Sequence, residues 1–442
     1  MPSNGNSLGR SFLAVAMFCS PLYCSLAFGD SKPEPIADPT QSVGDLEQLI
    51  QDLDHPKFRV RESASRNLAA AGKLGATQSV PVEALAKALE EGSVEVFWRG
   101  FTVLGTWCEA DDPDSRRSTI KALKRLKESE KPVVVELASG MLKRMVQSQH
   151  VWAVNKLRQF GAQISRNQKT VTTIRLDQNW RGGDEGLVYL PEVNGLEEVY
   201  LERSSVTDRG LATVATIPKL KKLYLAKTQI NGEGLGYLAK APELTFLSLK
   251  GVPLEGDAFE SLSKVTQLLE LGLDDTLADD VSMQHLESLT KLTKLWLNYT
   301  RITDAGLESL EKLQDLEKLI LTGVPAKGAG LKSLGEIKSL RYLSLQYVEI
   351  TDEGMQHIVH LTNVENLGLD DTKIGDDGLV YLEKLTALKT LWLTNTNVTD
   401  DGIESLTKLS SLTRLIIKGT KLSESGIEQL KKALPKCSIE LE

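Results

Sequence analysis

The chain has 442 residues, of which 25% are charged and 5% are aromatic, and its formal net charge is −8 at pH 7. This length leaves room for two or three domains. The acidic balance argues against a nucleic-acid-binding protein that relies on basic patches, and the low aromatic content fits a core built mainly from leucine.

Residues 1–29 predict a secretory signal peptide. Arg10 supplies a sparse positive charge, residues 12–28 are mostly apolar, and residues 27–29 fit a small-x-small cleavage site before Asp30. The apolar stretch is short for a membrane span. We therefore expect an exported protein, in the periplasm, at the cell surface or outside the cell, with no stable membrane span after cleavage. A retained anchor and a chain without a signal are the alternatives.

The four cysteines point to no disulfide framework. Cys19 and Cys24 each follow a large aromatic residue, where a lipoprotein signal carries a small one. Cleavage of the signal leaves Cys108 and Cys437, which lie in different predicted domains. Cys437 lies near the end of the repeats described below, and we expect it to be a small buried apolar residue.

Residues 30–42 contain three prolines and no apolar periodicity, which predicts a linker. Residues 43–165 are helical in pattern, with a 36-residue repeat in which Val60 and Leu68 return as Val96 and Leu104. The V-R-x-x-A-x-x-x-L pattern of the first copy resembles HEAT repeats. That resemblance implies stacked antiparallel helices with a binding or spacer role, and an unrelated helical cap is the alternative.

Further amphipathic stretches complete the predicted helical domain. They cover residues 115–127, 133–146 and 152–161, and the last of them precedes a first strand formed by Val171, Ile174 and Leu176. Residues 166–442 then form the second predicted domain.

This second domain repeats a 24-residue unit, seen most clearly in residues 292–315. Its L-x-x-L-x-L core predicts a short strand whose leucines face one side. The T-D-x-G-L-x-x-L segment that follows predicts a short helix or 3₁₀ turn with Asp304 as its N-cap. Gly306 in the first turn would allow neighbouring repeats to approach closely. One repeat cannot bury its leucines alone, so neighbours must stack.

About eleven repeats share this register. Gly306 or a substitute recurs every 24 residues, with Ala258 and Ser282 as the substitutes, and residues 439–441 predict a twelfth strand. The units resemble leucine-rich repeats, in the 24-residue form of bacterial and ribonuclease-inhibitor-like members. The resemblance implies an α/β horseshoe solenoid with a parallel sheet on its concave face. Many such repeats place asparagine after the strand; here the residue is threonine, as in Thr300, or valine, as in Val324, so a continuous asparagine ladder is absent.

A longer period of four repeats duplicates the outward strand positions. The first copy is Gly272, Asp274, Trp296 and Asn298, and the copy 96 residues later is Gly368, Asp370, Trp392 and Thr394. Glycine leaves a shallow depression, tryptophan offers a flat apolar surface, and aspartate offers a charged hydrogen-bond acceptor. This combination suits a sugar ring or a peptide side chain. Alternation along the strand predicts that both tryptophans are exposed. A recent duplication without a ligand role is the alternative.

The candidate ligand-binding residues all lie on the predicted concave face. They are Tyr200, Tyr224, Asp274, Trp296, Asn298, Tyr342, Asp370, Trp392 and Thr394. The leading hypothesis is an exported scaffold that docks a protein or peptide partner there, and the alternative is a binder of carbohydrate or cell-envelope polymer.

The sequence contains no pattern that predicts catalysis or a cofactor. His357 and His360 lack the HExxH pattern of zinc enzymes, and G-x-S-x-G, P-loop and dinucleotide fingerprints are absent. The acidic pairs at 274–275 and 279–280 could suggest Ca²⁺, but a solvated edge with Asp280 as a helix N-cap is the preferred interpretation. We therefore expect no enzyme activity, no cofactor and no bound metal.

Overall fold

The computed structural model describes residues 43–73, 79–108, 113–167 and 170–441. They form two compact units that divide between Val146 and Gln147. The predicted signal peptide and linker lie outside the described residues, and the domain border at 165/166 stays a prediction. Within the described ranges, no helix is both long enough and apolar enough to cross a membrane.

The first unit is helical, as the periodicity predicts. Its helices are α3 (Val43–Asp52), α4 (Phe58–Lys73), α5 (Ser79–Glu91), α6 (Val94–Cys108), α7 (Pro113–Leu126) and the first half of α8 (Pro132–Gln159). Helices that are two apart in chain order are neighbours, α4 beside α6 and α5 beside α7. Leu68 and Leu104 are fully buried, and the Trp107 indole N–H donates to the Leu68 carbonyl at 2.8 Å. The assignment to HEAT repeats stays a prediction.

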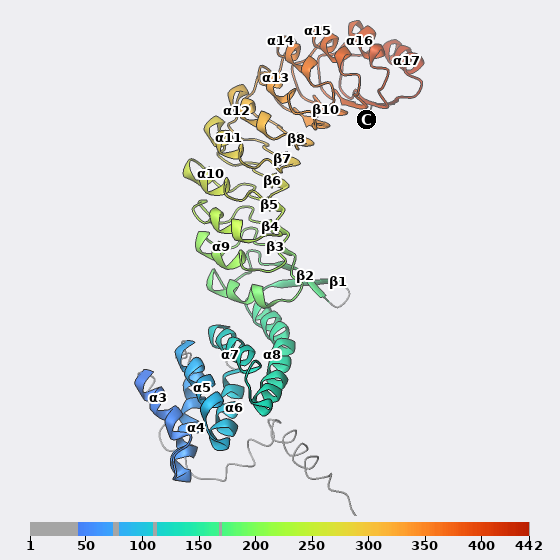
Figure 1. Cartoon of the computed structure of the whole chain (residues 1–442). Helices are drawn as coiled ribbons and strands as arrows, with labels where there is room; N and C mark the ends of the chain where they lie inside the picture. The colour runs from blue at the N-terminus through green and yellow to red at the C-terminus, as the bar shows by residue number, and fades with distance from the viewer. Residues whose placement is uncertain (1–42, 74–78, 109–112, 168–169, 442) are drawn as a thin grey trace, which may run out of the picture. The chain divides into compact units, whose positions relative to one another are not determined.

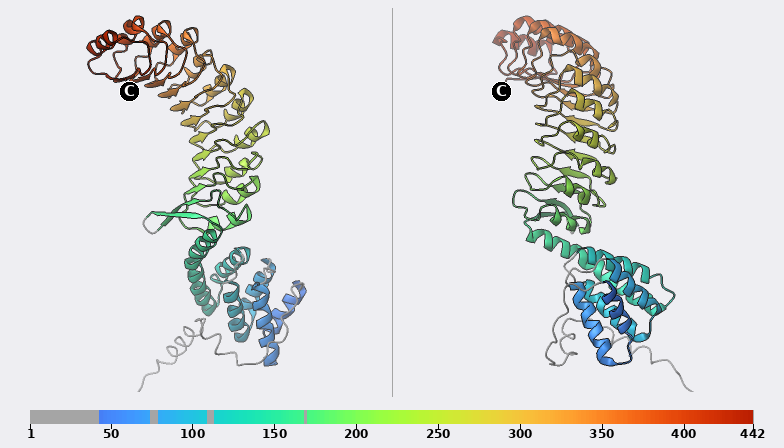
Figure 2. Two further views of the ribbon diagram at one scale, coloured as in Figure 1. Left: turned by 180° about the vertical axis from the view of Figure 1, so that it is seen from behind. Right: turned by 90° about the vertical axis from the view of Figure 1, so that its left-hand side faces the viewer.

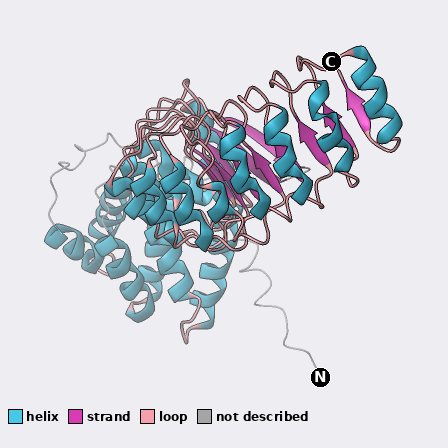
Figure 3. Ribbon diagram, turned by 90° about the horizontal axis from the view of Figure 1, so that it is seen from above, coloured by secondary structure: helices cyan, strands magenta, loops and turns pink. Residues whose placement is uncertain are grey.

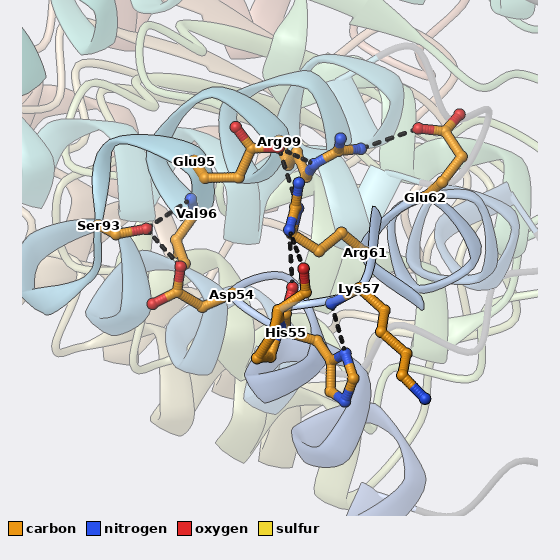
Figure 4. A network of polar contacts seen from close by, with 10 residues as sticks. Asp54, His55, Lys57, Arg61, Glu62, Ser93, Glu95, Val96 and Arg99 are labelled. Atoms are coloured by element: carbon orange, nitrogen blue, oxygen red, sulfur yellow. Dashed lines mark hydrogen bonds and ion pairs between the residues drawn. The ribbon is translucent and has the colours of Figure 1, made fainter. Parts of the chain in front are cut away.

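An ion-pair network joins α4 to α6 at the surface (Figure 4). The Arg99 guanidinium donates to Glu62 at 2.9 Å and to Glu95 at 2.8 Å, and Arg61 donates to Glu95 at 3.2 Å. The hydrogen bond from Arg99 holds the pKa of Glu95 below its ordinary value. These groups are partly exposed, so each pair contributes at most about 1 kcal/mol.

The sequence predicted separate helices at 133–146 and 152–161, and this was wrong. The structure has one helix of 28 residues, Pro132–Gln159. No glycine or proline interrupts residues 147–151, so nothing breaks the helix there. It begins with proline, whose missing N–H costs nothing in the first turn. It stops just before Gly161, whose φ of +101° is left-handed.

The second unit carries a sheet of thirteen strands that follow one another in chain order. β1 (Gln163–Asn167) pairs antiparallel with β2 (Thr170–Arg175), and all later pairings are parallel. The later strands are β3 (Glu198–Tyr200), β4 (Lys222–Tyr224), β5 (Phe246–Ser248), β6 (Glu270–Gly272), β7 (Lys294–Trp296), β8 (Lys318–Ile320), β9 (Tyr342–Ser344), β10 (Asn366–Gly368), β11 (Thr390–Trp392), β12 (Arg414–Ile416) and β13 (Ser438–Glu440). The twelve parallel strands confirm the predicted count. The sequence did not predict β1, which lacks the leucine pattern and covers the first edge of the parallel array.

Short helices or 3₁₀ turns follow each strand from β2 to β12 and return the chain to the next strand. They are η1 (Glu185–Glu192), α9 (Asp208–Val214), η2 (Leu235–Lys240), α10 (Asp257–Leu262), α11 (Asp280–Leu286), α12 (Asp304–Glu308), η3 (Ser309–Lys312), α13 (Leu331–Leu334), α14 (Asp352–Met355), η4 (Gln356–His360), α15 (Asp376–Leu379), η5 (Val380–Lys384), η6 (Asp400–Gly402), α16 (Ile403–Lys408) and α17 (Glu424–Ala433). The repeats of this unit follow an arc with the parallel strands on its inner side and these helices on its outer side (Figures 1, 2 and 3).

The leucines of every repeat join one continuous core. Leu295, Leu297, Leu307 and Leu310 of the repeat at 292–315 are fully buried, and their equivalents are buried in the neighbouring repeats. Cys437 is only half-buried against this core. The prediction of a solenoid that buries its leucines by stacking is confirmed.

The predicted N-cap at Asp304 was wrong by one residue. Thr303 is the N-cap of α12, with extended backbone (φ −103°, ψ −172°) and a hydroxyl that accepts from the Ala305 N–H. The carboxylate that caps this helix comes from the previous repeat. Asp280 accepts from the Thr303 N–H and hydroxyl at 2.7 Å each, and from the Gly306 N–H at 3.0 Å.

This contact recurs along the described repeats. At seven equivalent positions, an aspartate accepts at least one backbone N–H of the next repeat: Asp184, Asp208, Asp280, Asp304, Asp352, Asp376 and Asp400. The sequence pattern of a single repeat predicted Asp280 and Asp304 as N-caps of their own helices, and it does not show contacts between repeats. The carboxylates instead tie each repeat to the next.

The asparagine ladder is replaced by contacts within each repeat. The Thr300 hydroxyl donates to the Leu297 carbonyl at 2.8 Å, three residues earlier in the same turn. The same contact forms at Thr228, Thr276, Thr372, Thr396 and Thr420. In repeats with valine, the backbone N–H reaches that carbonyl, as from Val252 to Leu249 at 3.0 Å. The turn after the strand is therefore closed without an inter-repeat side-chain ladder.

Candidate binding surface on the concave face

Alternation along each short strand decides which side chains face the inner side of the arc. In β7, Leu295 is buried in the core, and Lys294 and Trp296 flank it on the outward side. Strands β3, β5, β8 and β11 show the same pattern of a buried residue between two partly exposed ones. The predicted register, with leucines inward and Trp296 and Trp392 outward, is confirmed.

A row of aromatic side chains runs across the outward positions of strands β3 to β7. The Arg175 guanidinium lies 3.7 Å over the Tyr200 ring centroid, and the Tyr200 and Tyr224 rings stack with centroids 4.0 Å apart. Phe246 continues the row, with centroid distances of 4.7 Å to Tyr224 and 6.5 Å to Trp296. Burial raises the pKa of the Tyr224 hydroxyl. Phe246 was not among the predicted site residues, although its place four repeats before Tyr342 marks it as the equivalent position.

The first duplicated group lies on β5–β7. Ser248, Gly272 and Trp296 are direct neighbours across the three strands. Just beyond β6, the half-buried Asp274 carboxylate accepts from the Asn298 N–H at 3.1 Å. Burial, the largest cause, raises the pKa of Asp274. This group therefore brings together the Trp296 indole, Gly272, which has no side chain, and the partly desolvated carboxyl of Asp274.

The second group repeats this arrangement on β9–β11. Ser344, Gly368 and Trp392 are again neighbours in register. The Asp370 carboxylate is only 7% exposed and accepts from the Thr394 N–H at 2.8 Å and from the amide of Gln346. Four strand spacings separate the two groups, which is about 19 Å.

Aromatic and basic side chains flank this second group. The rings of Tyr342 and Trp392 have centroids 6.0 Å apart, and the Lys318 ammonium lies 4.5 Å over the Tyr342 ring. Burial raises the pKa of Tyr342, and the charge of Asp370 adds to the shift.

The prediction that both tryptophans are exposed needs correction. Trp296 and Trp392 are half-buried, because Phe246 and Tyr342 pack against their rings. Three candidate residues also have a structural role. The Asp274 and Asp370 carboxylates accept backbone N–H groups of the next repeat, and so does the Asn298 side chain, from Thr322 at 2.9 Å. Thr394 supplies its backbone N–H.

Two polar features of the second group were not visible in the sequence. The Ser344 hydroxyl is buried and makes no hydrogen bond within the described residues. The Gln346 amide occupies one oxygen of Asp370. Both features depend on side-chain conformations, which no sequence pattern reports.

Two exposed tyrosines lie beyond the strand ends, next to this surface. Tyr299 and Tyr347 have φ values of +55° and +58°, and both are more than half exposed. A non-glycine residue in this region costs about 1 kcal/mol. Glycine occupies the equivalent position at Gly323, between them. Each tyrosine lies three residues after the end of its strand, β7 or β9.

The acidic pairs are explained by local contacts. Asp279 caps α11 through the Ser282 N–H, which lowers the pKa of Asp279, and Asp280 binds the next repeat. Within the described ranges, no group of three or more His, Cys, Asp and Glu side chains is placed to hold a metal ion.

Comparison with known families identifies the repeat. Residues 284–310, which include the strand and helix described above, match the family model of the leucine rich repeat. This match covers one repeat, and the other repeats share its 24-residue register and its buried leucines. The second unit therefore has the fold of a leucine-rich repeat solenoid, and a helical region precedes it in the chain. No curated protein matches the chain.

The chain is similar to several solved structures at low sequence identity. An internalin of Listeria monocytogenes is 20% identical over 57% of this chain and 69% of its own, with a TM-score of 0.46. A leucine-rich repeat protein of Leptospira interrogans is 19% identical over 57% and 80%, with a TM-score of 0.36. The ectodomain of a plant receptor kinase from Arabidopsis thaliana, solved with Casparian strip integrity factor 2, is 16% identical over 63% and 43%, with a TM-score of 0.38. What those proteins bind carries no weight for this chain.

Proposed function

We propose that this chain is an exported, non-enzymatic scaffold that docks a protein or peptide partner on the concave face of its solenoid. The main support is the duplicated group on the outward side of the sheet. Trp296 lies beside Gly272, and 96 residues later Trp392 lies beside Gly368 in the same arrangement. A half-buried indole next to a position without a side chain offers a rigid apolar contact of the kind that dominates interfaces.

The two groups favour an extended ligand. They lie about 19 Å apart on one continuous face, with the aromatic row from Tyr200 to Phe246 at one end. A chain that runs across the strands could contact both groups and the row together. A carbohydrate or cell-envelope polymer is the alternative, because indole rings and carboxylates also suit sugar rings. Two experiments distinguish these ligand classes. Binding on a glycan array supports the carbohydrate, and recovery of a protein in a crosslinking pull-down from the exported fraction supports the protein or peptide partner.

Export rests on the apolar N-terminal segment and its small-x-small site before Asp30. We expect the mature protein recovered from the exported fraction to begin at Asp30. N-terminal sequencing and intact mass measure this directly. Recovery of a chain that still carries Met1 would contradict the proposed cleavage.

Binding should depend on both tryptophans. Trp296→Ala and Trp392→Ala are each expected to weaken partner binding by about 1–3 kcal/mol, the range for interface anchors. The melting temperature should fall by only a few degrees, because neither ring belongs to the leucine core. Binding and melting are measured on the same variants by calorimetry.

The matched control is Trp98→Ala, which removes a tryptophan that is 44% exposed in the helical unit. It should leave binding unchanged. If the two sheet variants keep their affinity and lose stability instead, the tryptophans are structural and the duplicated face is a relic of duplication.

A further inference from the structure

The duplicated carboxylates differ from the other acids of the concave face. Glu198 pairs with Lys222 at 3.0 Å, and Glu270 pairs with Lys294 at 2.8 Å. Asp370 accepts only uncharged donors within the described residues, the Thr394 N–H and the Gln346 amide. Each glutamate of these two strand pairs is neutralised by its lysine, whereas Asp370 has no cationic partner among the residues that the structure describes.

Asp274 repeats this situation. The nearby Lys250 forms its ion pair with Asp275, at 3.7 Å, and Asp274 accepts from the Asn298 N–H. Its carboxyl has lost water without gaining a direct ion pair. Burial raises its pKa although the charge of the nearby Lys250 opposes the shift. Desolvating a carboxylate is costly unless a charged donor replaces the water. Both positions therefore favour the arrival of a cation.

Aromatic rings stand beside each carboxylate. Tyr342 and Trp392 flank the second group, and Phe246 and Trp296 flank the first. A Lys or Arg head group is attracted to the face of such rings, most strongly to tryptophan. An aromatic wall beside a desolvated carboxylate is therefore a good environment for a basic side chain that also carries an apolar stem.

We propose that each group binds one basic side chain, Lys or Arg, of an extended peptide segment of the partner. This rests on the proposed function and adds the chemistry of the ligand. The separation of about 19 Å corresponds to about six residues of extended chain at roughly 3.3 Å each. The two basic residues are therefore about six positions apart, i and i+6.

The contacts of Gln346 and Ser344 indicate how the second group would change when the ligand cation binds. The Gln346 amide donates to Asp370 where the ligand cation would donate. A Cβ atom placed on Gly368 would lie 3.5 Å from the Ser344 hydroxyl oxygen and 3.7 Å from the Gln346 Nε2. An incoming cation would displace the amide from Asp370, and the amide could then turn to the unpartnered Ser344 hydroxyl. Binding would thus give a hydrogen bond to the Ser344 hydroxyl, which has no partner among the described residues.

The experiment selects random displayed peptides on the immobilised full chain. We expect enrichment of peptides with Lys or Arg at i and i+6. A synthetic peptide from that pool, measured by fluorescence anisotropy, should lose at least about tenfold in affinity when either basic residue becomes glutamine. The loss should be smaller at high salt, where exposed charge attraction is screened.

Variants of the chain test the named residues. Asp274→Asn and Asp370→Asn are each expected to weaken the peptide by at least about tenfold. Both keep an oxygen for the backbone N–H that the carboxylate accepts. Asp377→Asn, the same charge change at an exposed position in α15, should have no effect. Gln346→Ala should strengthen binding, because it removes the amide that competes for Asp370.

The outcomes separate this inference from the proposed function. Enriched peptides without basic residues, whose binding still depends on Trp296 and Trp392, would overturn the inference alone. Peptides whose binding is indifferent to the tryptophans as well would overturn both. A selection that enriches no peptide also overturns the inference, and the glycan array then decides the function.

Discussion

Leu345→Asp is expected to abolish the cooperative unfolding of the solenoid. Leu345 follows β9, is 1% exposed and lies in the continuous leucine core. Its N–H donates to the Gly368 carbonyl of the next repeat at 2.8 Å, so its backbone position is fixed by the sheet. A carboxylate there would be buried without a partner. Leu345→Ala removes only packing and should cost about 2–5 kcal/mol.

Thermal and urea unfolding, followed by circular dichroism, measure both variants. The matched control is Lys227→Asp, which places a carboxylate two residues after Leu225, at an exposed position with φ of +55°. Aspartate already occupies the equivalent position at Asp275 and Asp371. This control should change the free energy of unfolding by less than about 1 kcal/mol. An unchanged melt for Leu345→Asp would mean that the strand is shifted by one residue.

The solenoid was predictable because its contacts are periodic. Each repeat packs on the units 24 residues before and after it, so the position of Leu295 in one unit implies that of Leu319 and Leu343. Features without a periodic signal were missed. β1 occurs once, and the continuity of α8 depends on the absence of a break rather than on the presence of a pattern.

The candidate site was predictable in its positions and not in its contacts. Alternation placed Trp296 and Trp392 on the outward face, and the 96-residue period showed that they are equivalent. The half-buried state of both rings results from neighbours on other strands. The unpartnered hydroxyl of Ser344 and the amide of Gln346 on Asp370 depend on rotamers, which are set by packing and not by sequence period.

The aspartates that bind the next repeat explain why two repeats lack the glycine in the first turn of the helix. A Cβ atom on Gly306 would lie 2.5 Å from an Asp280 carboxylate oxygen. Ala258 and Ser282 are the two residues that replace this glycine, and in both cases the preceding repeat has glycine in place of the aspartate, at Gly232 and Gly256. The carboxylate and the Cβ atom therefore compete for one space.

We expect this competition to appear as a coupling energy between Asp280 and Gly306. Asp280→Gly removes three hydrogen bonds to the next repeat and should cost about 2–4 kcal/mol. Gly306→Ala forces a Cβ atom against the carboxylate and should cost about 1–3 kcal/mol. The double variant reproduces the pairing that the chain uses at Gly232 and Ala258. It should cost at least about 1 kcal/mol less than the two single changes added together.

Urea unfolding of the four chains measures the cycle. The Ile302 methyl group, which a Cβ atom on Gly306 would meet at 2.8 Å, is present in every variant, so its contribution cancels in the coupling. Asp315→Gly combined with Gly306→Ala is the matched control, because Asp315 is exposed and lies in the turn after η3. That pair should be additive within about 0.5 kcal/mol. Additivity of Asp280→Gly with Gly306→Ala would show that the glycine is kept for its backbone freedom, and that the carboxylate does not need the space.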